Sequence, residues 1–405
     1  MRSRLLDRRR LAQWYLIGAA CLVPVLACPA TTLAAQERPL PTQNAMAGAR
    51  VFGSEGCVKC HAIDGLGGTE GPDLASFPTS RTFYDLAAAM WNHLPAMVTR
   101  MRELGISKPH LSERETGDLI AFLFSLNYFD TAGDTASGRA LFDENRCILC
   151  HQVGGVGGVV GPNLSISGTI QAPIEFATAM WNHGPAMSEA MQARGVARPR
   201  FTGSQLRDLI AYIKTDKEGL PSGPLYVLPG LAGEGRQVFV EKTCNNCHDV
   251  EGLGAHAAPD LADRGVSGSL LTFAAAMWNK APAMTASMRA KGLSVPSLTP
   301  TEMADLVGYL YSVKYFTQSG DARRGRQRVR TRGCLACHTL DGRGTGGAGE
   351  FRDMPRFTTP AAITAALWNH VLLGEQGGTA VDWPVLKAGE IADLAAFLMS
   401  LSAGR

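Results

Sequence analysis

The sequence predicts an all-α fold made of four tandem repeats, and three observations lead to this expectation. A Cys-x-x-Cys-His motif occurs four times, as CVKCH (57–61), CILCH (147–151), CNNCH (244–248) and CLACH (334–338). The first cysteines are 90, 97 and 90 residues apart, a period that is longer than a solenoid unit and indicates repeated domains. Apolar residues recur at three- and four-residue spacing, and no segment shows sustained alternation with period two.

Each repeat contains the same elements in the same order. A glycine-containing segment precedes the motif, as in GARVF (48–52), and a glycine-rich loop follows it. An alanine-rich amphipathic stretch comes next, as in YDLAAAMWN (84–92). The last element is a strongly periodic helix behind a polar start, expected at 112–126, 204–213, 301–313 and 388–401.

The connections between repeats differ in length. The segment DKEGLPSGPLYVLPG (216–230) has three prolines and three glycines and is the clearest predicted linker. The joins near 131–135 and 317–320 are short. We therefore expect repeats 1 and 2 to pack as one pair, and repeats 3 and 4 as another.

The N-terminus has the layout of a secretory signal peptide. A basic start (1–10) precedes an apolar run (11–27) that is short for a membrane span, and small residues follow near Ala35. We expect cleavage near Ala35. Processing as a lipoprotein at Cys28 and an uncleaved anchor are the alternatives, and all three place the protein outside the cytoplasm, in the periplasm or an equivalent compartment.

The charge balance argues against a nucleic-acid partner. The whole chain carries a formal charge of +3, but residues 1–10 hold five arginines and one aspartate. Without them 34 basic and 35 acidic side chains remain, so the net charge is −1. The 45% apolar and 19% charged content is ordinary for a folded soluble protein.

The four motifs predict covalent haem attachment. Two cysteines that flank two residues can bond to the two vinyl groups of one haem, and the adjacent histidine then lies under the iron as its ligand. A zinc ribbon needs four ligands close together, whereas each cysteine pair here stands alone in its repeat. We therefore predict four covalently bound haem c groups, held by Cys57, Cys60, His61, Cys147, Cys150, His151, Cys244, Cys247, His248, Cys334, Cys337 and His338.

With these motifs, each repeat resembles a class I cytochrome c domain. The turns GPDL (71–74) and GPNL (161–164) match the family's Gly-Pro-x-Leu turn, which holds the proximal histidine through a backbone carbonyl, and APDL (258–261) nearly does. The resemblance implies four small helical domains, each around one covalent haem. The expected boundaries are 1–35 for the signal peptide, 216–230 for the linker, and 44–130, 133–215, 231–316 and 319–402 for the domains.

The resemblance also implies that the first and last helices of a domain pack together. In repeats 1 to 3 a glycine and an aromatic residue of the first helix would meet an aromatic residue of the last. These sets are Gly48 and Phe52 with Phe122, Gly138 and Phe142 with Tyr212, and Gly235 and Phe239 with Tyr309.

A methionine is the sixth iron ligand that the resemblance implies for repeats 1 to 3. Met97, Met187 and Met284 each lie 36 residues after a motif histidine and are the expected ligands. The proline two residues before each of them is expected to break the helix and direct the sulfur towards the iron. Met101, Met191 and Met288, one turn later, form the alternative set.

Two histidines near these methionines are expected to have another role. His93 and His183 follow the sequence Trp-Asn in repeats 1 and 2, but repeat 3 has Lys280 at that position and keeps both methionines. The histidine is therefore dispensable within this chain's own repeats. We expect both side chains to lie partly exposed at a helix end.

Repeat 4 departs from the other repeats. Gly374 and Gly378 occupy the two methionine positions, Gly349 replaces the proline of the turn, and Val329 replaces the aromatic residue of the first helix. We expect His370 to be the sixth ligand. The alternatives are Met354 and a five-coordinate or water-ligated iron. Without the proline, LWNHVLLG (367–374) is expected to continue as one helix.

Repeat 4 also begins with six arginines, all within 322–334. They predict either a solvated basic helix face or a docking surface for an acidic partner or anionic lipid.

The functional expectation is an exported multihaem cytochrome c that carries electrons between redox partners in a respiratory or other electron-transport chain. Its expected partners are other redox proteins or a membrane respiratory complex, with peripheral membrane association as a further expectation. The alternative is an enzyme, or a subunit of one, with an open-coordination haem in repeat 4. No set of catalytic side chains stands out, so an electron carrier is preferred.

Haem stoichiometry tests the four motifs. We expect four haems per chain after denaturation, because all four motifs are complete. Pyridine haemochrome absorbance relative to protein mass measures the number. A value of two, or haem that is extracted by acidified acetone, would contradict covalent attachment at all four motifs.

Overall fold

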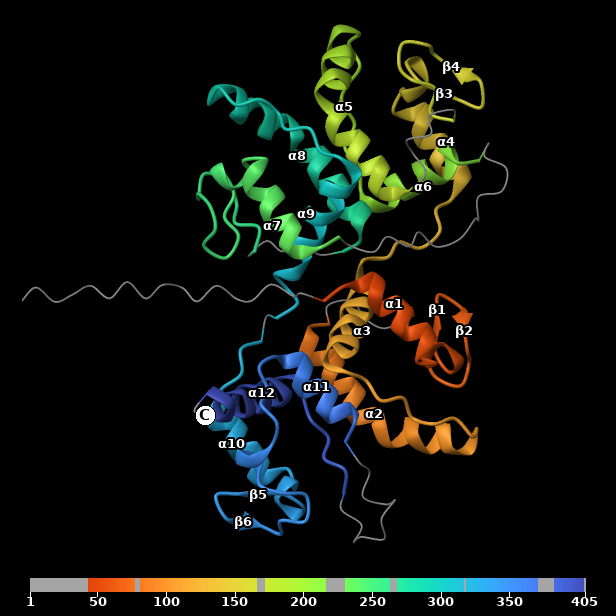
Figure 1. Cartoon of the computed structure of the whole chain (residues 1–405). Helices are drawn as coiled ribbons and strands as arrows, with labels where there is room; N and C mark the ends of the chain where they lie inside the picture. Colours follow the sequence, from red (N-terminus) through yellow and green to blue (C-terminus); the bar gives the residue numbers. More distant parts are fainter. Residues whose placement is uncertain are drawn as a thin grey trace, which may run out of the picture. The chain divides into compact units, whose positions relative to one another are not determined.

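The computed structural model describes residues 43–76, 81–165, 172–215, 230–262, 268–316, 318–370 and 382–403. The predicted signal peptide, almost all of the predicted linker, Gly374 and Gly378 lie outside these residues. The described part is helical, which confirms the predicted all-α fold (Figure 1). Strands in this part are three antiparallel pairs of two residues each: β1 (Ala62–Ile63) with β2 (Leu66–Gly67), β3 (Gln152–Val153) with β4 (Val156–Gly157), and β5 (Thr339–Leu340) with β6 (Arg343–Gly344).

Each repeat has a first helix, a one-turn 3-10 helix that begins at the first motif cysteine, a middle helix and a closing helix. Repeat 1 consists of α1 (Ala45–Ser54), η1 (Cys57–Lys59), α2 (Phe83–Glu103) and α3 (Glu113–Ser125), and repeat 2 of α4 (Thr135–Glu144), η4 (Cys147–Leu149), α5 (Pro173–Ala193) and α6 (Gly203–Ile213). Repeat 3 consists of α7 (Ala232–Glu241), η5 (Cys244–Asn246), α8 (Leu270–Ala290) and α9 (Pro300–Ser312). Repeat 4 consists of α10 (Ala322–Thr331), η6 (Cys334–Ala336), α11 (Pro360–Trp368) and α12 (Ala388–Ala403). Three further 3-10 helices are η2 (Leu74–Ser76), η3 (Leu126–Tyr128) and η7 (Phe351–Asp353).

The first and closing helices of every repeat touch through a glycine. A Cβ added to Gly48 would lie 1.9 Å from the carbonyl oxygen of Asp118, and Gly138, Gly235 and Gly325 make the same approach to Asp208, Asp305 and Asp393 at 1.9 to 2.0 Å. The aromatic rings expected to meet beside this contact have centroids 5.7 Å apart for Phe52 and Phe122, 5.5 Å for Phe142 and Tyr212, and 5.6 Å for Phe239 and Tyr309. The expected packing of these two helices is thereby observed.

The same aspartate anchors the N-terminus of the first helix. Its side chain accepts a hydrogen bond from the backbone N–H of the residue before that helix: Asn44 to Asp118 (2.7 Å), Asp134 to Asp208 (2.9 Å), Leu231 to Asp305 (2.8 Å) and Asp321 to Asp393 (2.8 Å). A backbone N–H group at a helix start has no partner within the helix, so this bond satisfies a group that would otherwise be unpaired. Glycine and aspartate together set the position of the first helix and of the haem motif after it.

The middle helices do not break at their prolines, so this expectation was wrong. α2, α5 and α8 continue through Pro95, Pro185 and Pro282. A proline inside a helix lacks the N–H that would bond to the carbonyl four residues earlier, at a cost of about 3 kcal/mol. In α2 and α8 the freed carbonyl belongs to a tryptophan and finds a donor in another repeat: Trp383 Nε1 lies 3.0 Å from the Trp91 oxygen, and an Arg198 guanidinium nitrogen 3.1 Å from the Trp278 oxygen.

The middle helix of repeat 4 is instead shorter than expected. α11 ends at Trp368, and His370 lies outside the helix, so the expected continuation through 367–374 was wrong. Lys108 of repeat 1 donates from Nζ to the carbonyls of Trp368 (3.0 Å) and His370 (3.3 Å). This cation satisfies carbonyls that a continued helix would have bonded internally, and a positive charge is favourable at a helix C-terminus.

A Trp-Asn dipeptide in every middle helix joins one repeat to another. The asparagine side chain donates to and accepts from the backbone of one leucine or phenylalanine, and the tryptophan Nε1 donates to the carbonyl of a proline two residues earlier. We call this arrangement the Trp-Asn clasp. The dipeptides are 91–92, 181–182, 278–279 and 368–369, and they bind the segments 384–386, 296–298, 199–201 and 109–111 respectively.

The clasps pair repeat 1 with repeat 4 and repeat 2 with repeat 3, and each pair is reciprocal. For example, Asn182 donates to the Leu298 carbonyl (2.7 Å) and accepts from its N–H (3.0 Å), while Asn279 makes the matching bonds to Phe201 (2.8 and 3.0 Å). The expectation that repeat 1 pairs with repeat 2, and repeat 3 with repeat 4, was therefore wrong. A short join limits how far two repeats can separate but supplies no contacts, whereas each clasp provides three hydrogen bonds of roughly 1 kcal/mol net each.

Repeats 1 and 3 are also in contact, through aromatic side chains. The rings of Tyr128 and Tyr311 stack with centroids 3.6 Å apart, and Phe124 packs edge-on against Tyr315 at 4.9 Å. The backbone N–H of Phe83 donates to the Tyr315 carbonyl at 2.9 Å.

Among the described helices, none combines the length and hydropathy that a membrane crossing requires.

Two glycines of α7 provide a matched test of the helix contact. Gly235→Ala should lower the free energy of unfolding by at least about 2 kcal/mol, because the new methyl group would lie 1.9 Å from the Asp305 carbonyl oxygen. Gly233→Ala, with no atom within 4 Å of the new methyl group, should raise it by about 0.5 to 1 kcal/mol through helix propensity. Denaturant unfolding followed by circular dichroism measures both. Equal effects of the two substitutions would refute the contact.

Candidate haem sites

The two cysteines of each motif lie on a one-turn helix that a left-handed residue introduces. That residue is Gly56, Arg146, Thr243 or Gly333, with φ between 59° and 78°. The N–H of each motif histidine then donates to the carbonyl of the first cysteine at 2.9 to 3.0 Å. All eight cysteines are half-buried and form no disulfide. The short turn places both sulfurs and the imidazole of one motif close together.

The first cysteine of each motif is a half-buried thiol whose surroundings do not favour a reactive thiolate. Burial raises the pKa of Cys57, Cys147 and Cys244 to about 11, and it also raises the pKa of Cys334. Reactive cysteines of redox proteins have lowered pKa values. The environment of these cysteines therefore does not favour a thioredoxin-like role.

The motif histidine is held in one orientation in repeats 1 to 3. The Nδ1 atoms of His61, His151 and His248 lie 3.0, 3.0 and 2.9 Å from the carbonyl oxygens of Pro72, Pro162 and Pro259. With Nδ1–H donating to that carbonyl, Nε2 is left as the metal-binding atom. This is the contact that the Gly-Pro-x-Leu turn implied.

The glycine of that turn allows the backbone to approach the ring. A Cβ on Gly71 would lie 2.5 Å from His61 Cε1, and Gly161 has the same relation to His151. The N–H of the residue at this position donates to the carbonyl of the second cysteine in all four repeats, from Gly71, Gly161, Ala258 and Ala348, at 2.7 to 2.8 Å. The loop after the motif is therefore fixed to the motif in each repeat.

Repeat 2 contains a cavity of about 540 Å³ with the composition of a haem pocket. Cys147, Cys150 and His151 line one part of it, and the α5 methionines line another. The remaining wall is mostly apolar, as expected for a cofactor site. Two free thiols, an oriented imidazole and an apolar cavity of this size fit a covalently bound haem.

The expected and the alternative methionine ligands share one face of the middle helix. Met187 and Met191 of α5 both line the repeat 2 cavity, as do Met180 and His183. Residues four apart on an uninterrupted helix lie on the same side, so the continuity of the helix through Pro185 brings both methionines to the cavity. Met97, Met187 and Met284 stay the predicted ligands of repeats 1 to 3.

His93 and His183 lie within helices and are exposed, whereas a position at a helix end was expected. Their Nδ1 atoms lie 2.8 and 3.1 Å from the carbonyls of Ala89 and Ala179, one turn earlier. The expected exposure is observed. The expected position at a helix end is not observed, because α2 and α5 continue through Pro95 and Pro185.

The motif histidine of repeat 4 lacks the proline contact. Gly349 stands where the proline is in the other repeats, and its carbonyl accepts from the N–H of Thr339 at 3.0 Å. The Nδ1 atom of His338 is buried without a hydrogen-bond partner. Burial lowers the pKa of His338, and the nearby carbonyls of Gly349 and Ala348 partly oppose that shift.

The structure brings His370 close to His338. Their ring centroids are 6.0 Å apart, with the ring planes at 60°. Two imidazoles on opposite sides of one metal ion need centroids roughly 6 Å apart, given metal–nitrogen bonds of about 2 Å. Phe351 packs on His338 at 4.8 Å and so closes another side of this site.

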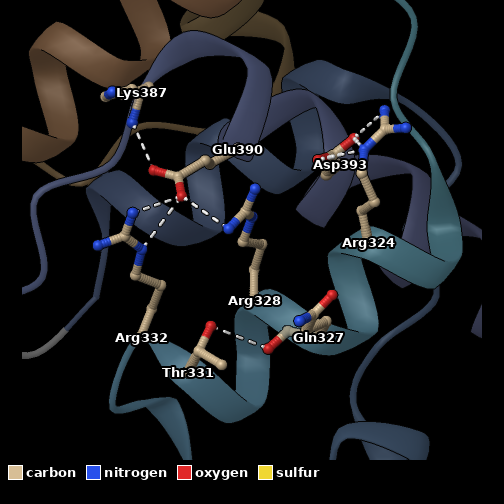
Figure 2. Close-up of polar contacts among 8 residues, drawn as sticks. All are labelled: Arg324, Gln327, Arg328, Thr331, Arg332, Lys387, Glu390 and Asp393. Atoms are coloured by element: carbon tan, nitrogen blue, oxygen red, sulfur yellow. Dashed lines mark hydrogen bonds and ion pairs between the residues drawn. The ribbon is translucent and has the colours of Figure 1, made fainter.

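The arginines of α10 are mostly engaged within repeat 4 (Figure 2). Arg324 pairs with Asp393 at 2.8 Å, and Arg328 and Arg332 pair with Glu390 at 3.3 and 2.5 Å. Arg326 pairs with Asp341. Burial would raise the pKa of Glu390, but the Lys387 N–H and the two arginines hold it below its ordinary value. Four of the six arginines thus neutralise carboxylates of their own repeat, which weakens the argument for a docking surface.

The cytochrome c family model matches residues 45–127, 135–217, 232–314 and 322–402. These segments cover most of the chain, which therefore belongs to the cytochrome c family and is a four-domain c-type cytochrome. Four covalently bound haem c groups follow from the four domains and their cysteine pairs, and the chain is a haem-binding electron-transfer protein. No curated protein matches the sequence.

Sequence reasoning did not assign a role to the tryptophans and asparagines of the clasp. The available signal was their recurrence: Trp-Asn occurs in all four repeats, including repeat 4, which has lost both methionines and the proline. A residue pair retained where the iron ligands change has a role apart from ligation. The partner segments, Pro-x-Leu or Pro-x-Phe before each closing helix, recur equally often.

Substitution of the methionines tests the ligand assignment. Met97→Ala, Met187→Ala and Met284→Ala should each remove about one third of the sulfur-to-iron charge-transfer band, because each would remove one of three thioether ligands. Near-infrared absorbance of the oxidised protein measures the band. Met101→Ala, Met191→Ala and Met288→Ala are the matched controls, and the opposite result would assign ligation to them.

Proposed function

We propose that the protein is an exported tetrahaem cytochrome c that passes electrons between redox partners in a respiratory or other electron-transport chain. The supporting observation is the repeat 2 cavity, whose lining includes His151, Met187 and Met191. Bound haem supplies a one-electron couple at its iron. When the chain's own side chains fill both axial positions, the site suits outer-sphere electron transfer more than substrate binding.

The proposed partners are other redox proteins or a membrane respiratory complex. Export is supported by the signal-like N-terminal sequence. Peripheral membrane association through α10 is a weaker proposal than its sequence suggested, because its arginines mainly bind Asp341, Glu390 and Asp393.

For repeat 4 we propose that His338 and His370 are both iron ligands. The support is the 6.0 Å separation of their rings and the contact of Lys108 with the His370 carbonyl, which holds the backbone beside that imidazole. Exchanging methionine for histidine lowers a haem potential, since methionine ligation raises it. The missing hydrogen bond at His338 Nδ1 acts in the opposite direction, because that bond raises ligand basicity. We expect the change of ligand to dominate.

One observation favours a second function, an enzyme or enzyme subunit that binds a small molecule at repeat 4. This repeat has no methionine at either expected position, and His338 is not held by a proline carbonyl. If His370 did not bind the iron, an open coordination site would remain.

The variant His370→Ala distinguishes these functions. The wild type should show one low-potential haem with a bis-imidazole low-spin signal, and His370→Ala should replace that signal by a high-spin one. Potentiometric titration and electron paramagnetic resonance (EPR) measure both properties. His93→Ala, at the matching position of repeat 1, should change neither. A high-spin ferric signal in the oxidised wild type, together with carbon monoxide binding by the reduced protein, would instead support the enzyme.

A further inference from the structure

Trp278 of repeat 3 forms part of the wall of the repeat 2 cavity. It lies in that wall together with Cys147, His151 and Met187, although it belongs to repeat 3, whose first helix begins at Ala232. Its side chain is 5% exposed and belongs to the apolar cluster of repeat 2, with Phe142 and Phe201. Its Nε1 donates to the Pro199 carbonyl at 2.8 Å, which fixes the indole in this position.

Repeats 1 and 4 are arranged in the same way, because the clasp tryptophan of each packs against residues of the other. Trp368 of repeat 4 is buried in the cluster of repeat 1, against which Cys57 and Met97 pack. Trp91 of repeat 1 lies edge-on to His370 of repeat 4, with ring centroids 5.7 Å apart, and stacks on Trp383 at 4.0 Å. In repeat 2, by contrast, Met180 and His183, directly before and after the Trp-Asn dipeptide, line the cavity of their own repeat.

We propose that the tryptophan of the Trp-Asn clasp acts on the haem site of the paired repeat and not on that of its own repeat. Each indole closes the partner's site against water. Because the apolar shell around a metal site controls solvent access and hence the reduction potential, the indole should raise the potential of the partner's haem. The haem sites then form two coupled pairs, 1 with 4 and 2 with 3.

The haem of repeat 4 is a natural reporter for this proposal, because its repeat lacks methionines at the ligand positions. Trp91→Phe, in repeat 1, should lower the midpoint potential of this haem and shift its EPR g-values. Trp368→Phe is the matched control. It removes an equivalent hydrogen bond from an indole Nε1 to a proline carbonyl, which is 2.9 Å long for Trp368 and 2.7 Å for Trp91. Trp368 is also only two residues from His370 in the sequence. Trp368→Phe should leave the haem of repeat 4 unchanged and lower the potential of one methionine-ligated haem.

Two outcomes would overturn the proposal. If Trp368→Phe changed the haem of repeat 4 and Trp91→Phe did not, each tryptophan would act on its own repeat. If both variants changed it equally, the clasp would only dock the repeats, since both variants lose one docking bond.

A second experiment, on repeats 2 and 3, does not depend on the ligands of repeat 4. In the variant Met187→Ala/Met191→Ala the haem of repeat 2 has lost both candidate thioethers and should bind carbon monoxide. Adding Trp278→Phe should increase the carbon monoxide association rate several-fold, because part of the cavity wall is removed. Adding Trp181→Phe, the equivalent residue of repeat 2 itself, should leave the rate unchanged. A rate that responds to Trp181→Phe alone would refute the proposal, while His370 ligation could still hold.

Discussion

The carboxamide of the clasp asparagine is the interaction on which the arrangement of the repeats depends. It bonds to both backbone groups of one residue in another repeat, as a neighbouring β-strand would. Both bonds go to the same residue, so together they fix the position of the partner segment against the asparagine. The adjacent tryptophan adds a large buried surface and one more hydrogen bond in the same register. Because each pair is reciprocal, two dipeptides and two Pro-x-Leu or Pro-x-Phe segments fix each other.

The helix prolines belong to the same arrangement. Pro95 and Pro282 each free the carbonyl of the tryptophan four residues earlier, and Trp383 or Arg198 of the paired repeat donates to it. Arg198 also lies over the Trp278 ring, 3.3 Å from its centroid, and burial lowers its pKa to about 10. A helix defect that would be costly in an isolated domain is thus compensated by the paired domain.

The features within one repeat were predictable from sequence because they depend on local spacing or on a recurring motif. The haem motif and the closing helices belong to this group, whereas the contact of Gly48 with the last helix was expected from the resemblance to class I cytochrome c domains. The pairing of repeats was not predictable in this way, because Asn182 and Leu298 are 116 residues apart and no local pattern links them. The helix break at Pro95 was wrongly predicted for a related reason: the rule treats the helix alone, whereas the compensating donor is 292 residues away. Similarly, α11 ends early because Lys108 of repeat 1 binds its terminal carbonyls.

Pairing of repeats 1 and 4 also gives a physical reason for the concentrated changes in repeat 4. α11 ends at Trp368, and His370 lies beside Trp91 of repeat 1. The clasp is nevertheless complete in repeat 4. Trp368 is the last residue of α11 and Asn369 caps the helix, and both side chains donate to their partner carbonyls in repeat 1. Ligation and pairing are therefore separable in this architecture. One can diverge in a single repeat while the other keeps that repeat docked.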